Sequence, residues 1–265
     1  MRFKMEIFFR NDDVNTLTQE LIVLMEIFEL HNIPITMAVE PANITKETVE
    51  WLKTKKLQNP EKICIIQHGY DHQDRIPGKG EFGGRSYEDQ FIDIKKGKEL
   101  MEKYFGDMFF PAFTCPRGYH NNATIKCMNH LGFKVFSSGH GIHLKHRILY
   151  YIGKKLQRTH LLGKHISYHT EKIPYTNLWE FSMSMSLIKH YFSKESCEFY
   201  TLSELKKLYQ LSAKRTNVIG ITLHHRYHKK KEDMDLVTSI IQYLKDQNCN
   251  FVTLEGLYRK YCNYA

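Results

Sequence analysis

The sequence predicts one α/β domain in which parallel strands form a closed or nearly closed barrel with helices outside it. Apolar runs typical of buried strands alternate, almost from the first residue, with segments whose apolar side chains recur at helical spacing. The chain has 265 residues, and it contains about seven such strands, which suits a barrel better than a short open sheet. No internal repeat or low-complexity linker interrupts it, so we expect a single domain over residues 1–265.

Strands and helices follow one another in order through the first half of the chain. Apolar side chains at helical spacing predict the first helix, and Pro34 breaks it. Thr45 opens the second helix and Ser86 the third. Strands are predicted at residues 5–9, 35–39, 62–67, 108–113 and 133–138, and helices at 16–31, 45–55, 86–104 and 122–131.

The segment from 139 to about 200 follows no clean period, and we expect an irregular excursion from the barrel there. It is rich in histidines and aromatic residues. Regular elements resume after it. Helices are predicted at residues 203–213 and 232–246, strands at 217–223 and 250–254, and a short helix at the end.

Composition narrows the classes of function. The formal net charge of +9 suits anionic partners or serves solubility alone, and no DNA- or RNA-binding motif accompanies it, so we expect no nucleic-acid partner. The six cysteines form no CxxC pair and no disulfide framework, which favours reduced thiols over a thiolate zinc site. The sequence shows no signal-peptide core and no apolar run of about 20 residues, so we expect a cytoplasmic protein without a membrane span.

Polar and titratable side chains follow four of the predicted strands, at the end where barrel enzymes carry their active sites. The first strand ends in RNDD (10–13), and the third ends in QHGYDH (67–72). The fourth runs into TCPRGY (114–119), and a late strand ends in HHRYH (224–228).

His68 and His72 are four residues apart. A helical turn would place both rings on one face, which suits one metal ion. Because the chain holds 15 histidines, the pair could also arise by chance on the surface. The metalloprotease pattern HExxH is absent, since Gly69 occupies the position of its glutamate. A metal site here therefore needs its base from elsewhere.

Asp12 and Asp13 stand side by side although adjacent carboxylates repel each other. Alone, the pair would be read as a cap of the following helix. Together with the two histidines, one aspartate can complete a metal site while the other stays free as a base. A divalent cation would offset their repulsion and would lower the pKa of its water towards about 7, so that the free aspartate could take the proton.

Five segments carry a resemblance to a known family and span nearly the whole chain: RNDDV, IPITMAVEP, QHGYDHQ, FTCPRGYHN and GITLHHRYH. Their order resembles that of the motifs of the polysaccharide deacetylases, the NodB-homology or carbohydrate esterase family 4-like enzymes. It is most similar to a divergent branch whose members often lack secretion signals. The resemblance implies a deformed, NodB-like (β/α) barrel of about seven parallel strands.

The resemblance also implies a divalent metal and its surroundings. Asp12 matches the family's base, and the metal ligands match Asp13, His68 and His72. Zn²⁺ is the expected ion, and Co²⁺, Mn²⁺ or Ni²⁺ are alternatives.

The family's closing Leu-x-His motif has two placements. If the strand ends at Leu223, His224 is the general acid, and if the letters are matched literally it is His225. We slightly prefer His224.

The family's Arg-Pro-Pro-Tyr loop falls on residues 114–117, where only Pro116 matches and Thr114 replaces the arginine. Arg10 or Arg117 could supply the missing guanidinium. The candidate substrate-binding residues are Arg10, Pro116, Arg117 and Tyr119.

The implied reaction is the hydrolysis of an amide or ester that removes an N- or O-linked acetyl group from a carbohydrate or sugar precursor. The metal and a backbone N–H of residues 116–119 would stabilise the oxyanion. Two other classes stay open. One is a catalytically altered glycan-binding barrel, which the missing arginine favours. The other is an Fe(II) oxygenase, whose usual ligand spacing differs.

Overall fold

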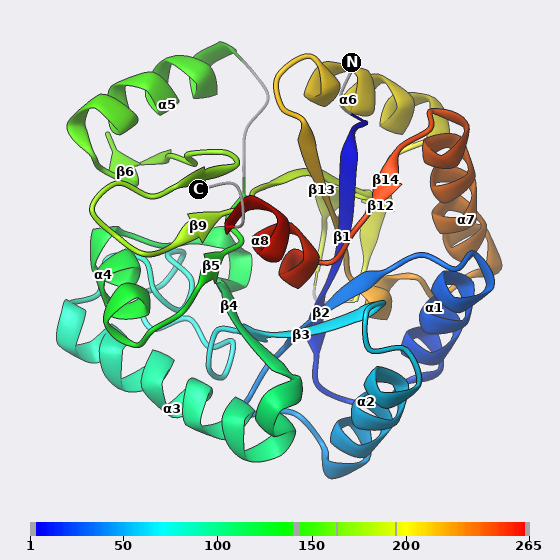
Figure 1. Ribbon diagram of the computed structural model, residues 1–265, viewed down its shortest axis with the longest axis horizontal. Coiled ribbons are helices and arrows are strands. Elements are labelled where there is room, and N and C mark those ends of the chain that lie inside the picture. The colour runs from blue at the N-terminus through cyan, green and yellow to red at the C-terminus, as the bar shows by residue number, and fades with distance from the viewer. Residues whose placement is uncertain (1–3, 140–143, 163, 194, 263–265) are drawn as a thin grey trace.

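Short apolar runs form a curled, mostly parallel sheet at the centre of the fold, in the computed structural model that describes residues 4–139, 144–162, 164–193 and 195–262. Figure 1 shows most helices arranged around this sheet, and the last one, residues 254–262, across its end. In spatial order the strands are β10 (Met183–Ser186), β13 (Val218–Leu223), β1 (Glu6–Val14), β2 (Ile35–Val39), β3 (Ile63–His68), β4 (Phe109–Thr114), β5 (Val135–Phe136), β9 (Trp179–Glu180) and β8 (Glu171–Lys172), with β14 (Asn250–Phe251) beside β1.

One segment closes the sheet into a barrel, because β9 and β10 follow each other directly along the chain. β9 pairs in parallel with β5, and β10 pairs in parallel with β13. Between them, the N–H groups of Phe181 and Met183 donate to the carbonyls of Phe136 and Ser138 at 3.1 and 2.7 Å. The ring therefore consists of β1, β2, β3, β4, β5, β9–β10 and β13. The predicted deformed barrel of about seven parallel strands is confirmed.

The outer helices begin where short polar side chains satisfy their first free N–H groups. Each of five caps accepts a hydrogen bond from the backbone N–H three residues further on: Thr18, Thr45, Ser86, Asn121 and Thr201.

Among the described residues, no helix is both long enough and apolar enough to cross a membrane. The helices are α1 (Gln19–Leu30), α2 (Lys46–Gln58), α3 (Tyr87–Phe105), α4 (Asn122–His130), α5 (Leu144–Leu156), α6 (Leu202–Ala213), α7 (Lys231–Asp246) and α8 (Leu254–Cys262).

The segment 139–200, expected to be irregular, contains regular elements, although residues 140–143, 163 and 194 lie outside the described part. It holds α5, the closing segment β9–β10 and two hairpins, β6 (His160–Leu161) with β7 (Lys164–His165) and β11 (Ile188–Tyr191) with β12 (Cys197–Phe199). The strands are two to four residues long, too short to show a period in the sequence.

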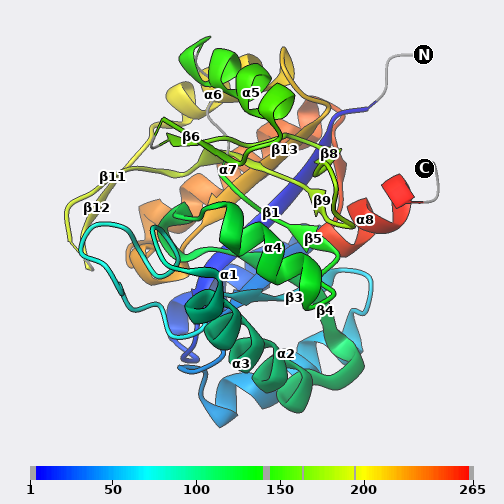
Figure 2. The same cartoon turned by 90° about the vertical axis from the view of Figure 1, so that its left-hand side faces the viewer.

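The barrel interior is apolar towards the amino ends of the strands. Alternate residues of each strand point inwards, and α8 closes this end with Leu254 and Leu257. Polar side chains are thus left to the carboxyl ends, where the short 3-10 turns η2 (Pro116–Gly118) and η3 (His225–Tyr227) follow β4 and β13. In Figure 2 the barrel is seen from the side, with α8 at one end and the β11–β12 hairpin towards the other.

Gly97 of α3 allows the helix to approach β3, and its replacement tests this contact. A Cβ at Gly97 would lie 2.2 Å from Nε2 of Gln67. That amide cannot move freely, because it donates to the carbonyls of Gly69 and Ile94 at 2.9 and 3.2 Å. Alanine gains about 1 kcal/mol of helix propensity, but we expect Gly97→Ala to lower the free energy of unfolding by about 1–3 kcal/mol through overpacking.

Urea denaturation measures this change, with Gly256→Ala in α8 as the matched control. The nearest atom to a Cβ at Gly256 is 3.4 Å away, so this variant should be as stable as the wild type or slightly more stable. Equal stability of the Gly97→Ala protein would contradict the packing argument.

Candidate functional site

The end of β1 brings two adjacent aspartates to one side of the barrel. Side chains alternate along a strand, so Arg10 and Asp12 point the same way as Phe8 of the inner core. Asp13 would point outwards, but its φ is 60° and the register between β1 and β2 shifts at this point. A bulge re-aims the side chain, and aspartate tolerates the left-handed conformation better than most residues. Asp12 and Asp13 are both buried, with exposures of 4% and 3%.

Asp12 forms a bidentate ion pair with Arg10. Nε and Nη2 of Arg10 donate to the two carboxylate oxygens at 2.7 and 2.8 Å. Nη1 of the same guanidinium donates to the carbonyl and the hydroxyl of Ser137 at 2.6 and 2.7 Å. Burial acts to raise the pKa of Asp12, but the charge and hydrogen bonds of Arg10 and the nearby imidazoles lower it overall. Asp12 is therefore ionised at neutral pH with a fixed orientation.

Asp13 faces the two histidines of the HxxxH pattern. Its Oδ1 lies 3.1 Å from Nε2 of His68 and 3.2 Å from Nε2 of His72, and its Oδ2 lies 3.4 Å from Nη1 of Arg226. Burial acts to raise the pKa of Asp13, but the hydrogen bonds of the imidazoles hold it well below its usual range. The pKa of His72 is raised to about 9, against the effect of burial, by the hydrogen bond and charge of Asp13.

A buried glutamate holds the turn that carries His72. Glu81 accepts hydrogen bonds from the N–H groups of Tyr70 and His72 at 2.8 and 3.1 Å. Burial raises its pKa to about 7 despite these bonds. Gly69 has a φ of 61°, and a Cβ there would lie 2.4 Å from Oε2 of Glu81 and 2.6 Å from Cγ of Pro116. Only glycine allows the turn to pack so closely on this support.

Asp13, His68 and His72 fit a divalent metal ion. Their ligand atoms all lie within 4.8 Å of one another. A tetrahedral site with bonds of about 2.0–2.1 Å separates its ligand atoms by about 3.3 Å, close to the O–N separations of 3.1 and 3.2 Å. Two imidazoles and a carboxylate are donors that zinc and neighbouring metals accept. His68 ends β3 and His72 follows a non-helical turn, so the helical turn expected from the spacing is wrong, although the rings do converge.

His224, the first residue after β13, lies beside the carboxylates. Burial lowers its pKa, and the charges of Asp13 and Asp12 act against this change. Nδ1 of His224 is 3.2 Å from the hydroxyl of Tyr191, which comes from the β11–β12 hairpin. This hydrogen bond fixes the orientation of the ring.

His225 turns towards a different partner. Its backbone N–H donates to Oδ1 of Asn11 at 3.0 Å, and its Nδ1 lies 3.1 Å from Nδ2 of the same side chain. Burial lowers the pKa of His225 to about 4. The ring is 2% exposed and ties β13 to β1.

The loop after β4 lies beside the metal-ligand turn, but its arginine does not reach the base candidate. Pro116 is buried against Gly69. The guanidinium of Arg117 lies 2.7 Å from Oδ2 of Asp74, and its side chain is 46% exposed. Tyr119 is 38% exposed. Of the two arginines considered as partners for Asp12, the structure therefore shows Arg10.

Three residues of this site were not singled out from the sequence. Glu81 supports the His72 turn, Arg226 contacts Asp13, and Tyr191 orients His224. The alternation of β1 would have predicted the Arg10–Asp12 pair, because residues two apart share a face. Glu81 and Tyr191 lie on loops and a hairpin whose path the sequence does not define.

Comparison with known proteins shows which family part of this chain is similar to. The family model of polysaccharide deacetylases matches residues 11–136. No curated protein sequence matches the chain.

Solved structures resemble the chain over nearly its whole length. A protein of Mycobacterium smegmatis assigned to the polysaccharide deacetylases has a TM-score of 0.67 at 12% identity, covering 98% of this chain and 91% of that one. A family 4 acetyl xylan esterase of Clostridium thermocellum, in complex with a cobalt ion, has a TM-score of 0.56 at 13% identity, covering 96% and 90%. A CE4 family pseudoenzyme of Bacillus anthracis has a TM-score of 0.55 at 12% identity, covering 96% and 66%.

At such low identities the structural similarity shows a shared fold and no more. The family model, in contrast, rests on sequence, and its match includes the carboxyl ends of β1, β3 and β4. Both point the same way: residues 11–136 match the polysaccharide deacetylase family, and the chain shares the fold of solved structures assigned to it.

Proposed function

We propose that this protein is a metal-dependent hydrolase that removes an N- or O-linked acetyl group from a carbohydrate or sugar precursor. The observation that supports this most is the convergence of Asp13, His68 and His72 beside an ionised Asp12, all at the carboxyl end of one barrel. A carboxylate that stays off the metal group, within the same buried site, is the arrangement that hydrolysis needs.

In this proposal Asp13, His68 and His72 hold the metal, with Zn²⁺ as the expected ion. A bound divalent ion would polarise the acyl carbonyl and would acidify a water molecule. Arg226, 3.4 Å from Asp13, adds positive charge on the open side of the site, where its side chain is 37% exposed. It is placed to attract the carbonyl oxygen of an acyl group.

Asp12 is the proposed general base. Its lowered pKa keeps it ionised, and the Arg10 pair prevents the carboxylate from rotating. It accepts the proton of the water that attacks the acyl carbon. The guanidinium is fully engaged by Asp12 and Ser137, so we propose that Arg10 orients the base rather than contacting substrate.

His224 is the proposed general acid, which protonates the leaving nitrogen or oxygen. Tyr191 holds its Nδ1, so the other ring nitrogen is free to face the substrate. Pro116, Arg117 and Tyr119 border the same end of the barrel and are proposed to line the substrate path, with backbone N–H groups of this loop as oxyanion donors.

Two aspartate variants test the division of roles. We expect Asp12→Asn to retain a divalent ion but to lose turnover by about 10²–10⁴-fold, because the base is removed and the ligands are not. We expect Asp13→Asn to lose the ion by at least about a hundredfold in affinity. Metal content by atomic emission, together with acetate release from a panel of acetylated oligosaccharides, measures both.

Thermal unfolding of the same proteins controls for folding. Near-normal turnover of Asp12→Asn would remove Asp12 from the role of base. A wild type that binds a metal but releases no acetate from any acetylated sugar would favour the glycan-binding alternative.

Metal binding should release a proton from His72. Below pH 9 the metal-free imidazole is protonated, because Asp13 raises its pKa to about 9, whereas a metal ligand must be neutral. The affinity for Zn²⁺ should therefore rise about tenfold per pH unit up to this pKa. Calorimetric titration in two buffers of different ionisation enthalpy counts the protons, and a pH-independent affinity would contradict the geometry.

Histidine variants separate the two candidates for the acid. We expect His224→Ala to lower kcat by about 10²–10³-fold with little change in metal content or melting temperature. His225→Ala should mainly lower the melting temperature, since it removes a buried ring bonded to Asn11. The reverse pattern would assign the role of the acid to His225.

A further inference from the structure

Helix α5 exposes an apolar face to the outside of the molecule. Five of its thirteen residues are large apolar side chains with exposures between 43% and 65%. They are Leu144, Ile148, Tyr151, Ile152 and Leu156. Positions three and four apart share one side of a helix, so these side chains form one stripe. The other side is buried through Tyr150 and Gly153, and Figure 1 shows α5 at the periphery of the fold.

This stripe is not the ordinary scatter of exposed apolar residues. The five α5 positions are more than a third of the fourteen exposed large apolar side chains in the described part of the chain. A contiguous apolar stripe on a soluble protein marks a contact surface.

Cations lie along and beside the stripe, and the helix carries no acidic residue. Lys145, Arg147, Lys154 and Lys155 lie on α5, and Arg158 follows it. Lys154 is paired with Glu171. Within the described residues, Lys145, Arg147 and Lys155 form no salt bridge. An apolar face that carries and adjoins lysine and arginine suits a helix that lies at an anionic membrane interface.

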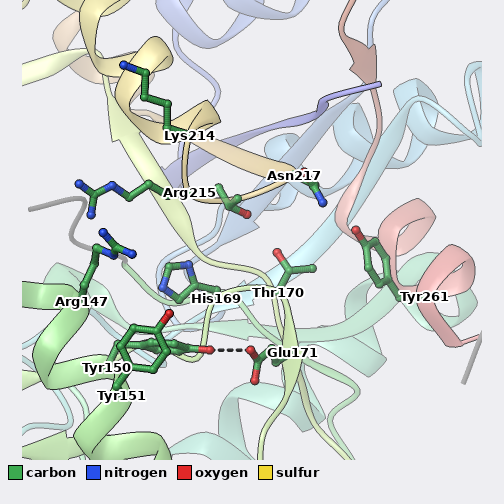
Figure 3. Close-up of a pocket in the computed structure, with 11 residues that line it drawn as sticks. Arg147, Tyr150, Tyr151, His169, Thr170, Glu171, Lys214, Arg215, Asn217 and Tyr261 are labelled. Carbon is green, nitrogen blue, oxygen red and sulfur yellow. Dashed lines mark hydrogen bonds between the residues drawn. The ribbon is translucent and has the colours of Figure 1, made fainter. Parts of the chain in front are cut away.

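A cavity of about 410 Å³ continues this positive surface (Figure 3). Arg147, Lys214 and Arg215 line it. Nη1 of Arg215 is buried without a hydrogen-bond partner in the described part of the chain, and an anion in the cavity would satisfy it. The one carboxylate in the lining, Glu171, is already bound by Tyr150 at 2.5 Å and by Lys154.

A half-buried histidine, His169, lies in the same cavity as these cations. Burial lowers the pKa of His169 to about 4; the charge of Glu171 opposes this change, and the charges of Lys154, Arg147 and Arg215 add to it. The imidazole is therefore neutral and offers no competing charge. The cavity combines cationic side chains with tyrosines, and this lining suits a phosphate group that is part of a larger molecule.

The cavity is separate from the proposed catalytic site. Thr216 and Asn217 in its lining precede β13, whereas His224 follows that strand. The six residues of β13 span about 20 Å. The cavity thus lies towards the amino ends of the strands.

We propose that the α5 surface, meaning the apolar stripe of α5 with Arg147, Lys214 and Arg215, docks onto an anionic phospholipid bilayer. The apolar side chains enter the interface, the cations contact lipid phosphates, and the cavity receives one headgroup. Charge complementarity favours this occupant over a second copy of the chain, because two copies with a net charge of +9 would bring the same cations face to face. The proposal does not depend on the enzymatic activity.

Vesicle flotation tests the docking. The vesicles contain phosphatidylcholine alone or mixed with phosphatidylglycerol. The wild type should bind the anionic vesicles at least about tenfold more strongly. Ile148→Ser with Ile152→Ser should weaken this binding about tenfold or more, because it removes apolar contact without neutralising charge. Leu30→Ser with Leu57→Ser, at positions 83% and 69% exposed elsewhere on the surface, is the matched control and should bind like the wild type.

A charge variant and a soluble phosphate distinguish the remaining candidates for what binds the α5 surface: an anionic bilayer, a free phosphate or a second copy of the chain. Arg147→Ala with Arg215→Ala should also weaken binding, whereas Lys95→Ala with Lys98→Ala on α3 should not. Absence of binding to anionic vesicles would overturn the proposal, as would equal binding by the Ile148/Ile152 variant. Glycerol phosphate binding without vesicle binding would identify a site for a free phosphate. A dimer in sedimentation velocity that the Ile148/Ile152 variant loses would identify a second copy.

Discussion

Two adjacent carboxylates buried at the end of β1 are the constraint on which the rest of the site depends. Each needs its own positive partner, because a buried charge without one costs several kcal/mol. Asp12 is matched by Arg10 from the same strand, and Asp13 by imidazoles from the end of β3 and the turn after it. The barrel satisfies both needs because parallel strands bring their carboxyl ends together. Each aspartate thus has its own partners, whose interactions offset the repulsion between the two carboxylates.

The different surroundings of the two aspartates explain how neighbours in sequence can have different roles. A straight strand would send their side chains to opposite faces. The left-handed conformation of Asp13 and the register shift beside it turn the second carboxylate back to the site. Asp12 keeps a guanidinium that leaves it ionised, while Asp13 faces two imidazoles that could share a metal ion with it. This division follows from the backbone of β1 and would not survive in a regular strand.

Much of this arrangement could be predicted from the sequence, because it follows from periodicity. Alternating strands and helices indicated the barrel, and polar residues after the strands indicated the site. The ring-closing β9–β10 segment could not be predicted, because β9 is only Trp179–Glu180 and β10 alternates methionine with serine, so neither forms an apolar run like those of the other strands. Tyr191 and Glu81 depend on how a hairpin and a loop fold back over the barrel. Their contacts are tertiary, and no local pattern encodes them.

The position of Arg10 in β1 has a consequence for the loop that follows β4. Arg10 reaches Asp12 within one strand and is anchored on Ser137, so the orientation of the proposed base does not depend on the loop after β4. β4 ends in Thr114, where the family pattern places an arginine, and Arg117 of the loop is engaged with Asp74 at the surface. Arg117 and Tyr119, which are exposed, can therefore differ with the substrate without disturbing the carboxylate of Asp12, whereas Pro116 packs against Gly69. β1 thus fixes the carboxylate of the proposed base, and exposed positions of the loop after β4 can vary with the substrate.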